Sequence, residues 1–149
     1  MGITGKNLEK SVVALISSNI IVAGNSTNES SYITSPRQAC QVLEVGVTVT
    51  KDAGSVINRE TIWQLNVYDK NNEGGTTLAN GTFADTAKAG DEITTRDGSF
   101  VWVADYANAS DRIFAKGARL TMKMTTTSDS ANDIFAPYVI AIPNGAEPL

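Results

Sequence analysis

Strict alternation of apolar residues with other residues is the feature that most constrains this chain, and it is clearest between residues 43 and 50. The apolar set and the residues between its members are Leu43, Val45, Val47 and Val49 against Glu44, Gly46, Thr48 and Thr50. Successive side chains of a β-strand point to opposite faces, so a period of two places the whole apolar set on one face. The segment therefore predicts a β-strand with one buried face.

The same period recurs in two later segments. Their apolar residues are Trp63, Leu65 and Val67, and Leu120, Met122 and Met124. The intervening segments 76–84, 92–96 and 99–105 are bounded by Gly, Asp or Asn. Turn signals thus recur about every ten residues, which is typical of β-sandwiches. We count eight or nine strands and predict an all-β chain folded as a single antiparallel β-sandwich.

The last predicted strand, residues 134–142, has apolar residues at both odd and even positions. Such a strand is expected to be central in its sheet or covered on both faces. Pro137 lies inside it and cannot donate a hydrogen bond to a neighbouring strand. We therefore expect a bulge or an unpaired backbone position at Pro137.

The first 35 residues differ from the rest of the chain. Leu8, Val12, Leu15 and Ile16 keep helical spacing, whereas the run at 20–22 is β-branched. This favours an N-terminal arm over residues 1–23, made of a short helix or extended arm and then a strand. Residues 24–35 are polar and predict a connecting loop, and residues 36–149 form the β-sandwich domain. The apolar arm must pack either on its own domain or on a neighbouring molecule.

Composition limits the partners and the chemistry. The chain has 149 residues, enough for one domain with its own hydrophobic core, and its formal net charge is −4. This charge argues against nucleic acid and against an anionic membrane as partner. No stretch resembles a signal peptide or a membrane span, so we expect a soluble chain that is not exported.

Histidine is absent and Cys40 is the only cysteine. The chain therefore lacks the commonest general base, and it has no disulfide framework and no cysteine-based zinc cluster. We expect neither an enzyme nor a cofactor.

Two sets of acidic residues are candidate sites. The segment Asp69–Gly74 resembles the start of a calcium-binding loop, but its twelfth position would be Asn80 where a bidentate Glu is needed, so a polar turn is favoured. A glycosidase needs two carboxyl groups, and the candidates are Asp85, Asp91, Glu92, Asp97 and Asp105. Their spacing has no signature, and acidic residues at turns more often cap backbone amides.

Aromatic residues offer a further candidate site. A sugar-stacking platform could be built from Trp63, Trp102, Tyr68 and Tyr106, because apolar sugar faces pack on flat rings. Both tryptophans share the parity of the predicted core, so burial is the favoured interpretation. Cys40, among apolar neighbours, is interpreted as a small buried hydrophobic residue.

Two stretches resemble a known class of proteins. Residues 33–42, Ile-Thr-Ser-Pro-Arg-Gln-Ala-Cys-Gln-Val, are similar to the opening strand of small jelly-roll structural proteins of tailed bacteriophages. Residues 113–122, Ile-Phe-Ala-Lys-Gly-Ala-Arg-Leu-Thr-Met, resemble the turn-to-strand element before their final hairpin, with Gly117-Ala118 where that class usually has Gly-Asp. The resemblance covers about residues 33–142 and implies a jelly-roll sandwich.

The resemblance also implies a role. These proteins are head decoration or cement proteins, commonly homotrimers on the shell of the major capsid protein, and the resemblance implies no catalytic residues. We therefore expect a virion structural protein on the capsid surface, made in the host cytoplasm. The alternatives are a tail or fibre component of the virion and a carbohydrate-binding β-sandwich module.

Overall fold

A computed structural model describes residues 13–16, 20–22, 27–34, 39–51, 60–69, 71, 75–126 and 133–143. These residues form eleven strands and two short 3₁₀ helices. The strands are β1 (Val13–Ile16), β2 (Ile20–Val22), β3 (Thr27–Thr34), β4 (Cys40–Lys51), β5 (Thr61–Tyr68), β6 (Thr76–Phe83), β7 (Glu92–Thr94), β8 (Phe100–Trp102), β9 (Ile113–Phe114), β10 (Arg119–Thr126) and β11 (Asp133–Pro143). The 3₁₀ helices are η1 (Ala104–Tyr106) and η2 (Ala109–Asp111).

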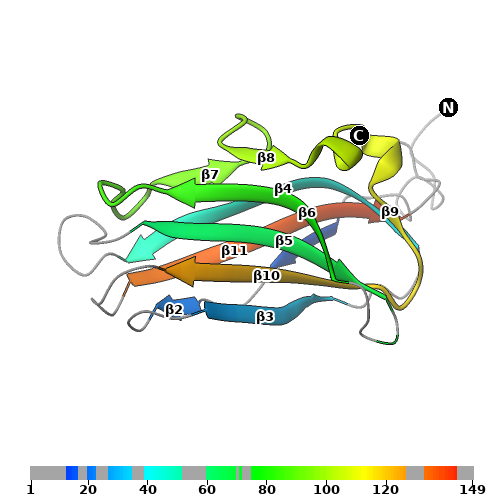
Figure 1. Ribbon diagram of the computed structural model, residues 1–149, viewed down its shortest axis with the longest axis horizontal. Coiled ribbons are helices and arrows are strands. Elements are labelled where there is room, and N and C mark those ends of the chain that lie inside the picture. Colours follow the sequence, from blue (N-terminus) through cyan, green and yellow to red (C-terminus); the bar gives the residue numbers. More distant parts are fainter. Residues whose placement is uncertain are drawn as a thin grey trace, which may run out of the picture.

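The strands form two antiparallel sheets packed face to face, as Figure 1 shows. One sheet has the order β1-β11-β4-β7, with β2 also paired to β11 and β9 to β4, and the other has the order β3-β10-β5-β6-β8. Strands β1 and β2 pair with successive parts of the same side of β11, so together they fill one strand position in their sheet. If the short strands β8 and β9 are left out, each sheet therefore has four strand positions. The chain alternates between these sheets as in an eight-stranded jelly roll. The predicted antiparallel β-sandwich of jelly-roll type is therefore confirmed.

The core lies between the two sheets, and its side chains come from the predicted alternating segments. Fully buried members include Val45, Val47, Val49, Trp63, Leu65, Leu120, Met122 and Met124. Phe135 of β11 packs against Trp63 of β5 in the other sheet, and their ring centroids lie 5.2 Å apart in an edge-to-face contact. Burying each such side chain stabilises the fold by about 1.5–3 kcal/mol.

One member of the predicted strand face is displaced. Val42 is fully buried, whereas Leu43, which we assigned to the core set, is only half-buried. The cause is a register shift: Ile140 of β11 pairs with Glu44, but Ala141 pairs with Val42, so Leu43 is an extra residue in the ladder. A bulge reverses the parity of the strand at that point.

β11 is a central strand, as its two-sided apolar pattern predicted. It pairs with β4 along one side and with β1 and β2 along the other. On the second side, β2 pairs as far as Phe135 and β1 begins at Tyr138, so Ala136 and Pro137 fall between the two registers. Pro137 itself is in register with Val47 of β4. Residues 17–19, which follow β1 and precede β2, lie outside the described residues, so the expected unpaired position on that side stays a prediction.

The N-terminal segment corrects two sequence-based predictions. Residues 13–16, assigned to a helix or arm, form strand β1 on β11, and so they belong to the sheet of their own domain. Residues 27–34, within the predicted polar loop 24–35, form strand β3 paired with β10. A strand is held by its backbone hydrogen bonds, which a polar sequence can make as well as an apolar one. Hydropathy therefore does not reveal it.

The two stretches that carry the resemblance also take places other than those expected. Residues 33–42 join the end of β3 to the start of β4, so they are not the opening strand. Residues 113–122 run from β9 through a turn at Gly117, whose φ is +88°, into β10, as expected of a turn-to-strand element. However, β10 and β11 lie in different sheets, and they do not form the final hairpin.

Candidate functional site

The segment between β8 and β9 is held in place by one buried cation. The Arg112 side chain is 6 % exposed, and it donates through Nε to the Val42 carbonyl at 3.0 Å. Its Nη1 donates to the carbonyls of Tyr106 at 2.8 Å and Ala107 at 3.1 Å. The guanidinium carbon also lies 3.9 Å from the centroid of the Trp102 ring. Arg112 therefore ties η1 to β4 and β8 at once.

The electrostatics of Arg112 follow from this position. Burial lowers its pKa from the ordinary value, and the nearby Asp111 carboxylate acts in the opposite direction. Arginine keeps its proton in proteins, so the charge must be compensated by the three carbonyl oxygens and the indole face. Gln41 adds a second tie, because its Nε2 donates to the Ala109 carbonyl at 2.9 Å. The segment is thus preorganised.

The segment presents a surface that combines apolar and acidic groups. Val101 and Ile113 flank it at 58 % and 41 % exposure, and they are the exposed large apolar side chains among the described residues. Between them, small and acidic side chains are exposed. We define the loop surface as Val101, Ala104, Asp105, Ala107, Ala109, Asp111 and Ile113, all of which are exposed. Its fixed backbone and small side chains suit close contact with another protein.

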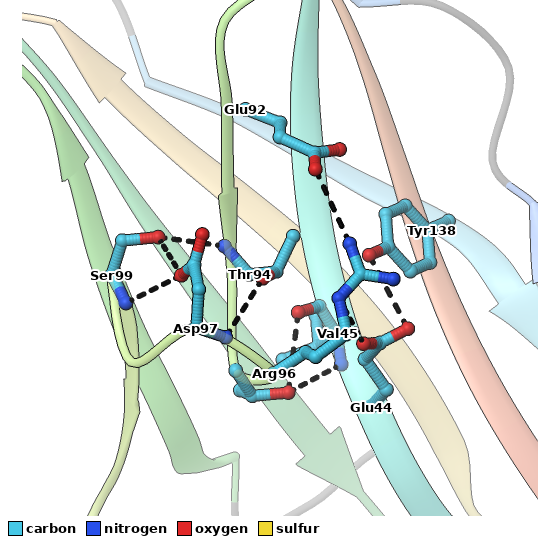
Figure 2. A network of polar contacts seen from close by, with 9 residues as sticks. Glu44, Val45, Glu92, Thr94, Arg96, Asp97, Ser99 and Tyr138 are labelled. Atoms are coloured by element: carbon cyan, nitrogen blue, oxygen red, sulfur yellow. Dashed lines mark hydrogen bonds and ion pairs between the residues drawn. The ribbon is translucent and has the colours of Figure 1, made fainter.

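A second feature lies on the outer face of the sheet over β11, β4 and β7, which are neighbours in this order, and Figure 2 shows Tyr138 there with its charged neighbours. Tyr138 pairs with Gly46 across β11 and β4. Its hydroxyl donates to Glu44 Oε2 at 3.4 Å. Arg96 Nε lies 3.6 Å from Glu44 Oε1, and Arg96 Nη2 lies 3.3 Å from Glu92 Oε1. We call Tyr138, Glu44, Glu92 and Arg96 the tyrosine platform.

The turn between β7 and β8 positions Arg96 in this platform. Thr95 is bonded to β4 in both directions: its amide donates to the Val45 carbonyl at 2.9 Å, and its Oγ1 accepts from the Val45 amide at 3.1 Å. Beyond Arg96, Asp97 Oδ1 accepts from the amide of Ser99 at 2.9 Å and also from its hydroxyl. The Asp97 amide in turn donates to Thr94 Oγ1 at 3.2 Å. Arg96 therefore extends from a hydrogen-bonded turn.

Two groups near this turn have shifted pKa values. Burial and the adjacent Glu44 carboxylate raise the pKa of Tyr138 to about 12, so the hydroxyl is a hydrogen-bond donor at neutral pH. The hydroxyl and amide of Ser99 lower the pKa of the Asp97 carboxyl below its ordinary value.

The aromatic residues considered as a sugar platform are not brought together. Trp63 is fully buried, which confirms its assignment to the core. Trp102 is half-buried beneath Arg112, and Tyr106 packs against the core and Phe114. Tyr68 lies at the end of β5 with the Arg119 guanidinium carbon 5.3 Å from its ring centroid.

Two of the acidic candidates, Asp91 and Asp97, act at turns. All five candidate carboxylates are exposed, and Asp91 Oδ2 accepts from the Lys88 amide at 3.1 Å, as Asp97 accepts from Ser99. In the calcium candidate, Asp69 Oδ1 accepts from the Asn71 amide at 2.8 Å, which is the bond of a turn. Residues 70 and 72–74 of that candidate lie outside the described residues.

Cys40 is 6 % exposed, and burial raises the pKa of its thiol, in agreement with its assignment as a small buried hydrophobic residue.

Within the described ranges, no three His, Cys, Asp or Glu side chains gather closely enough to hold a metal ion. No helix in the same part of the chain is long and apolar enough to cross a membrane.

Two residues that build these candidate sites were not found from the sequence. Arg112 binds the backbone carbonyl of the distant Val42 and those of Tyr106 and Ala107 in its own segment, and no sequence pattern marks a backbone partner. Tyr138 falls within the predicted last strand, residues 134–142, and nothing in that pattern marks it as a site residue. The available signal was Gly46, because a glycine inside a strand often marks the close approach of another group.

Comparisons with known proteins identify no family. No family model and no curated protein matches the sequence. Among solved structures, the chain is similar to the tumour necrosis factor Eiger from S. frugiperda, with a TM-score of 0.43 and 8% identity over 93% of this chain and 94% of that one. It is also similar to a chain in the structure of infectious bursal disease virus Gx strain, with a TM-score of 0.43 and 10% identity over 93% of this chain and 33% of the viral chain. For Desmodium yellow mottle tymovirus the TM-score is 0.32, with 11% identity over 90% of this chain and 88% of that one.

Proposed function

We propose that this chain is a structural protein of a tailed-bacteriophage virion, which binds the capsid surface as a decoration or cement protein and has no catalytic activity. The sequence resemblance of residues 113–122, which form the expected turn-to-strand element, suggests this role, and the jelly-roll sandwich is compatible with it. The observation that carries the proposal is the loop surface.

The loop surface fits a protein partner for physical reasons. Val101 and Ile113 expose apolar side chains that gain free energy when another surface covers them. The loop between them is held by Arg112, so little conformational entropy is lost on binding. Its carboxylates, Asp105 and Asp111, lie in the chain between the two apolar residues and favour a partner with basic groups between apolar patches. We assign this complementary surface to the major capsid protein.

We also propose that the protein acts as a homotrimer. One loop surface is small, and a contact of this size is weak by itself. Three linked copies would bind a symmetric shell with much higher avidity than one copy. Light scattering tests this part separately: a trimer mass supports it, and a monomer at micromolar concentration contradicts it.

The position of the protein in the particle tests the role. Gold-labelled antibody against this chain, applied to virions of the phage that encodes it, should decorate the head in electron micrographs. Label on the tail or the fibres would favour the alternative virion component. Virions without any label, together with soluble protein in the lysate, would contradict a virion role.

A further inference from the structure

The ring of Tyr138 rests against the backbone of its neighbouring strand. A Cβ atom built on Gly46 would lie 2.5 Å from Tyr138 Cε1 and 2.6 Å from both Cζ and the hydroxyl oxygen. Such distances are possible only because glycine has no side chain at this point. The ring therefore lies over Gly46 on the outer face of the sheet, and Tyr138 remains partly exposed.

Charged groups surround the hydroxyl end of this ring, as Figure 2 shows. The side chains of Glu92 and Arg96 are 43% and 65% exposed, whereas that of Glu44 is 16% exposed. Glu44 is thus oriented by both Tyr138 and Arg96, while Glu92 and Arg96 remain accessible to an added group. A guanidinium has five N–H donors, which is more than these two ion pairs use.

A comparison within the same molecule shows what is special about Tyr138. Tyr68 also lies over a glycine, since a Cβ on Gly75 would be 2.5 Å from Tyr68 Cε1. The Arg119 guanidinium carbon lies 5.3 Å from the centroid of the Tyr68 ring, whereas the cation next to Tyr138 is engaged with two carboxylates. The two tyrosines therefore share a backbone setting but differ in their polar neighbours.

We infer that the tyrosine platform is a binding site for a neutral, β-linked saccharide. An aromatic ring offers a flat apolar surface to the face of a pyranose that carries axial C–H groups. The accessible carboxylate and guanidinium at its edge can accept from and donate to the sugar hydroxyls. Two carboxylates against one guanidinium disfavour an acidic sugar. This site uses residues other than the loop surface, so it does not depend on the proposed capsid contact.

The experiment uses the full chain and cellohexaose as the probe. We expect saturation transfer from the protein to the axial ring protons of the sugar, with a dissociation constant in the millimolar range, and backbone amide shifts confined to Gly46, Thr94 and their neighbours. A hexamer of galacturonic acid should bind more weakly. Absence of transfer to cellohexaose, or amide shifts that map to Trp102 or Tyr68, would overturn the assignment.

Variants separate recognition from folding. Tyr138→Ala should abolish saturation transfer, and Tyr68→Ala, which removes the matched ring elsewhere, should not change it. Since Tyr138→Ala disturbs the contact with Gly46, Glu92→Gln provides a second variant that leaves the ring in place. It should weaken binding by roughly two- to tenfold, the effect of one altered hydrogen bond. Unchanged binding in both platform variants would show that the tyrosine serves only to cover Gly46.

Discussion

The guanidinium carbon of Arg112 lies 3.9 Å from the centroid of the Trp102 ring, so a buried cation is stacked on the indole that ends strand β8. The same guanidinium binds carbonyls of β4 and η1. These contacts of Arg112 fix the conformation of the loop surface. The proposed capsid contact therefore depends on interactions that also stabilise the fold.

Replacing Arg112 tests that connection. Arg112→Met should lower the free energy of unfolding by about 2–4 kcal/mol, because the buried carbonyl of Val42 and the part-buried carbonyls of Tyr106 and Ala107 lose their donor. Urea unfolding followed by tryptophan fluorescence measures the loss. Arg119→Met is the matched control, since that guanidinium carbon lies 5.3 Å from the centroid of the Tyr68 ring. The control should cost less than about 1 kcal/mol, and equal losses in both variants would contradict the assigned role of Arg112.

The contact between Tyr138 and Gly46 should limit the size of the residue at position 46. Gly46→Ala should destabilise the protein by about 1–3 kcal/mol, because its Cβ would lie 2.5 Å from the Tyr138 ring. In a Tyr138→Ala background the same substitution should cost little, because the clash is gone. A double-mutant cycle by urea unfolding measures this coupling. Additive losses would show that the ring does not rest on Gly46.

Asp97 should make the β7–β8 turn sensitive to acid. Its pKa is lowered by the hydrogen bonds from Ser99, so its carboxylate stabilises the folded turn at neutral pH. This stabilisation should be fully present above the ordinary pKa of Asp, decline as the pH falls below that value, and be lost as the pH falls through the lowered pKa of Asp97. The Ser99 amide resonance reports the transition in an NMR titration. In Asp97→Asn it should not titrate, and a transition at or above the ordinary Asp pKa in the wild type would contradict the prediction.

The N-terminal strands should contribute to the stability of the domain. Deleting residues 1–23 removes β1 and β2 and leaves one side of β11 unpaired, which should lower the urea midpoint and promote aggregation. Deleting only residues 1–12 keeps both strands and is the control. If both shortened proteins unfold at the wild-type urea midpoint, the pairing of β1 and β2 with β11 does not contribute to the free energy of unfolding.

The alternating segments show how far sequence reasoning reaches in this protein. Trp63 and Leu65 were assigned to the core correctly, because a period of two directly encodes a buried face. Leu43 was assigned wrongly, because a bulge changes the parity of a strand without leaving a mark in the hydropathy. Strand β3 was missed because its polar sequence pairs with β10 through backbone groups.

The candidate surfaces were harder to predict for a related reason. Arg112 acts through carbonyls of Val42, Tyr106 and Ala107, and backbone partners have no residue type that a sequence pattern could recognise. Tyr138 meets Gly46 only through the register of β11 on β4. Register depends on the bulges and on neighbouring strands, which become visible only in the folded chain.

Binding to assembled shells tests the central claim most directly. If the proposed role is right, the full chain should sediment with empty phage shells built from the major capsid protein alone. Val101→Asp, on the loop surface, should weaken this binding at least about tenfold, because an exposed apolar contact is replaced by a charge. Thr82→Asp, at an exposed position of the neighbouring strand β6, is the matched control and should bind as the wild type does. Wild-type protein that stays in the supernatant, or equal binding by all three proteins, would contradict the account.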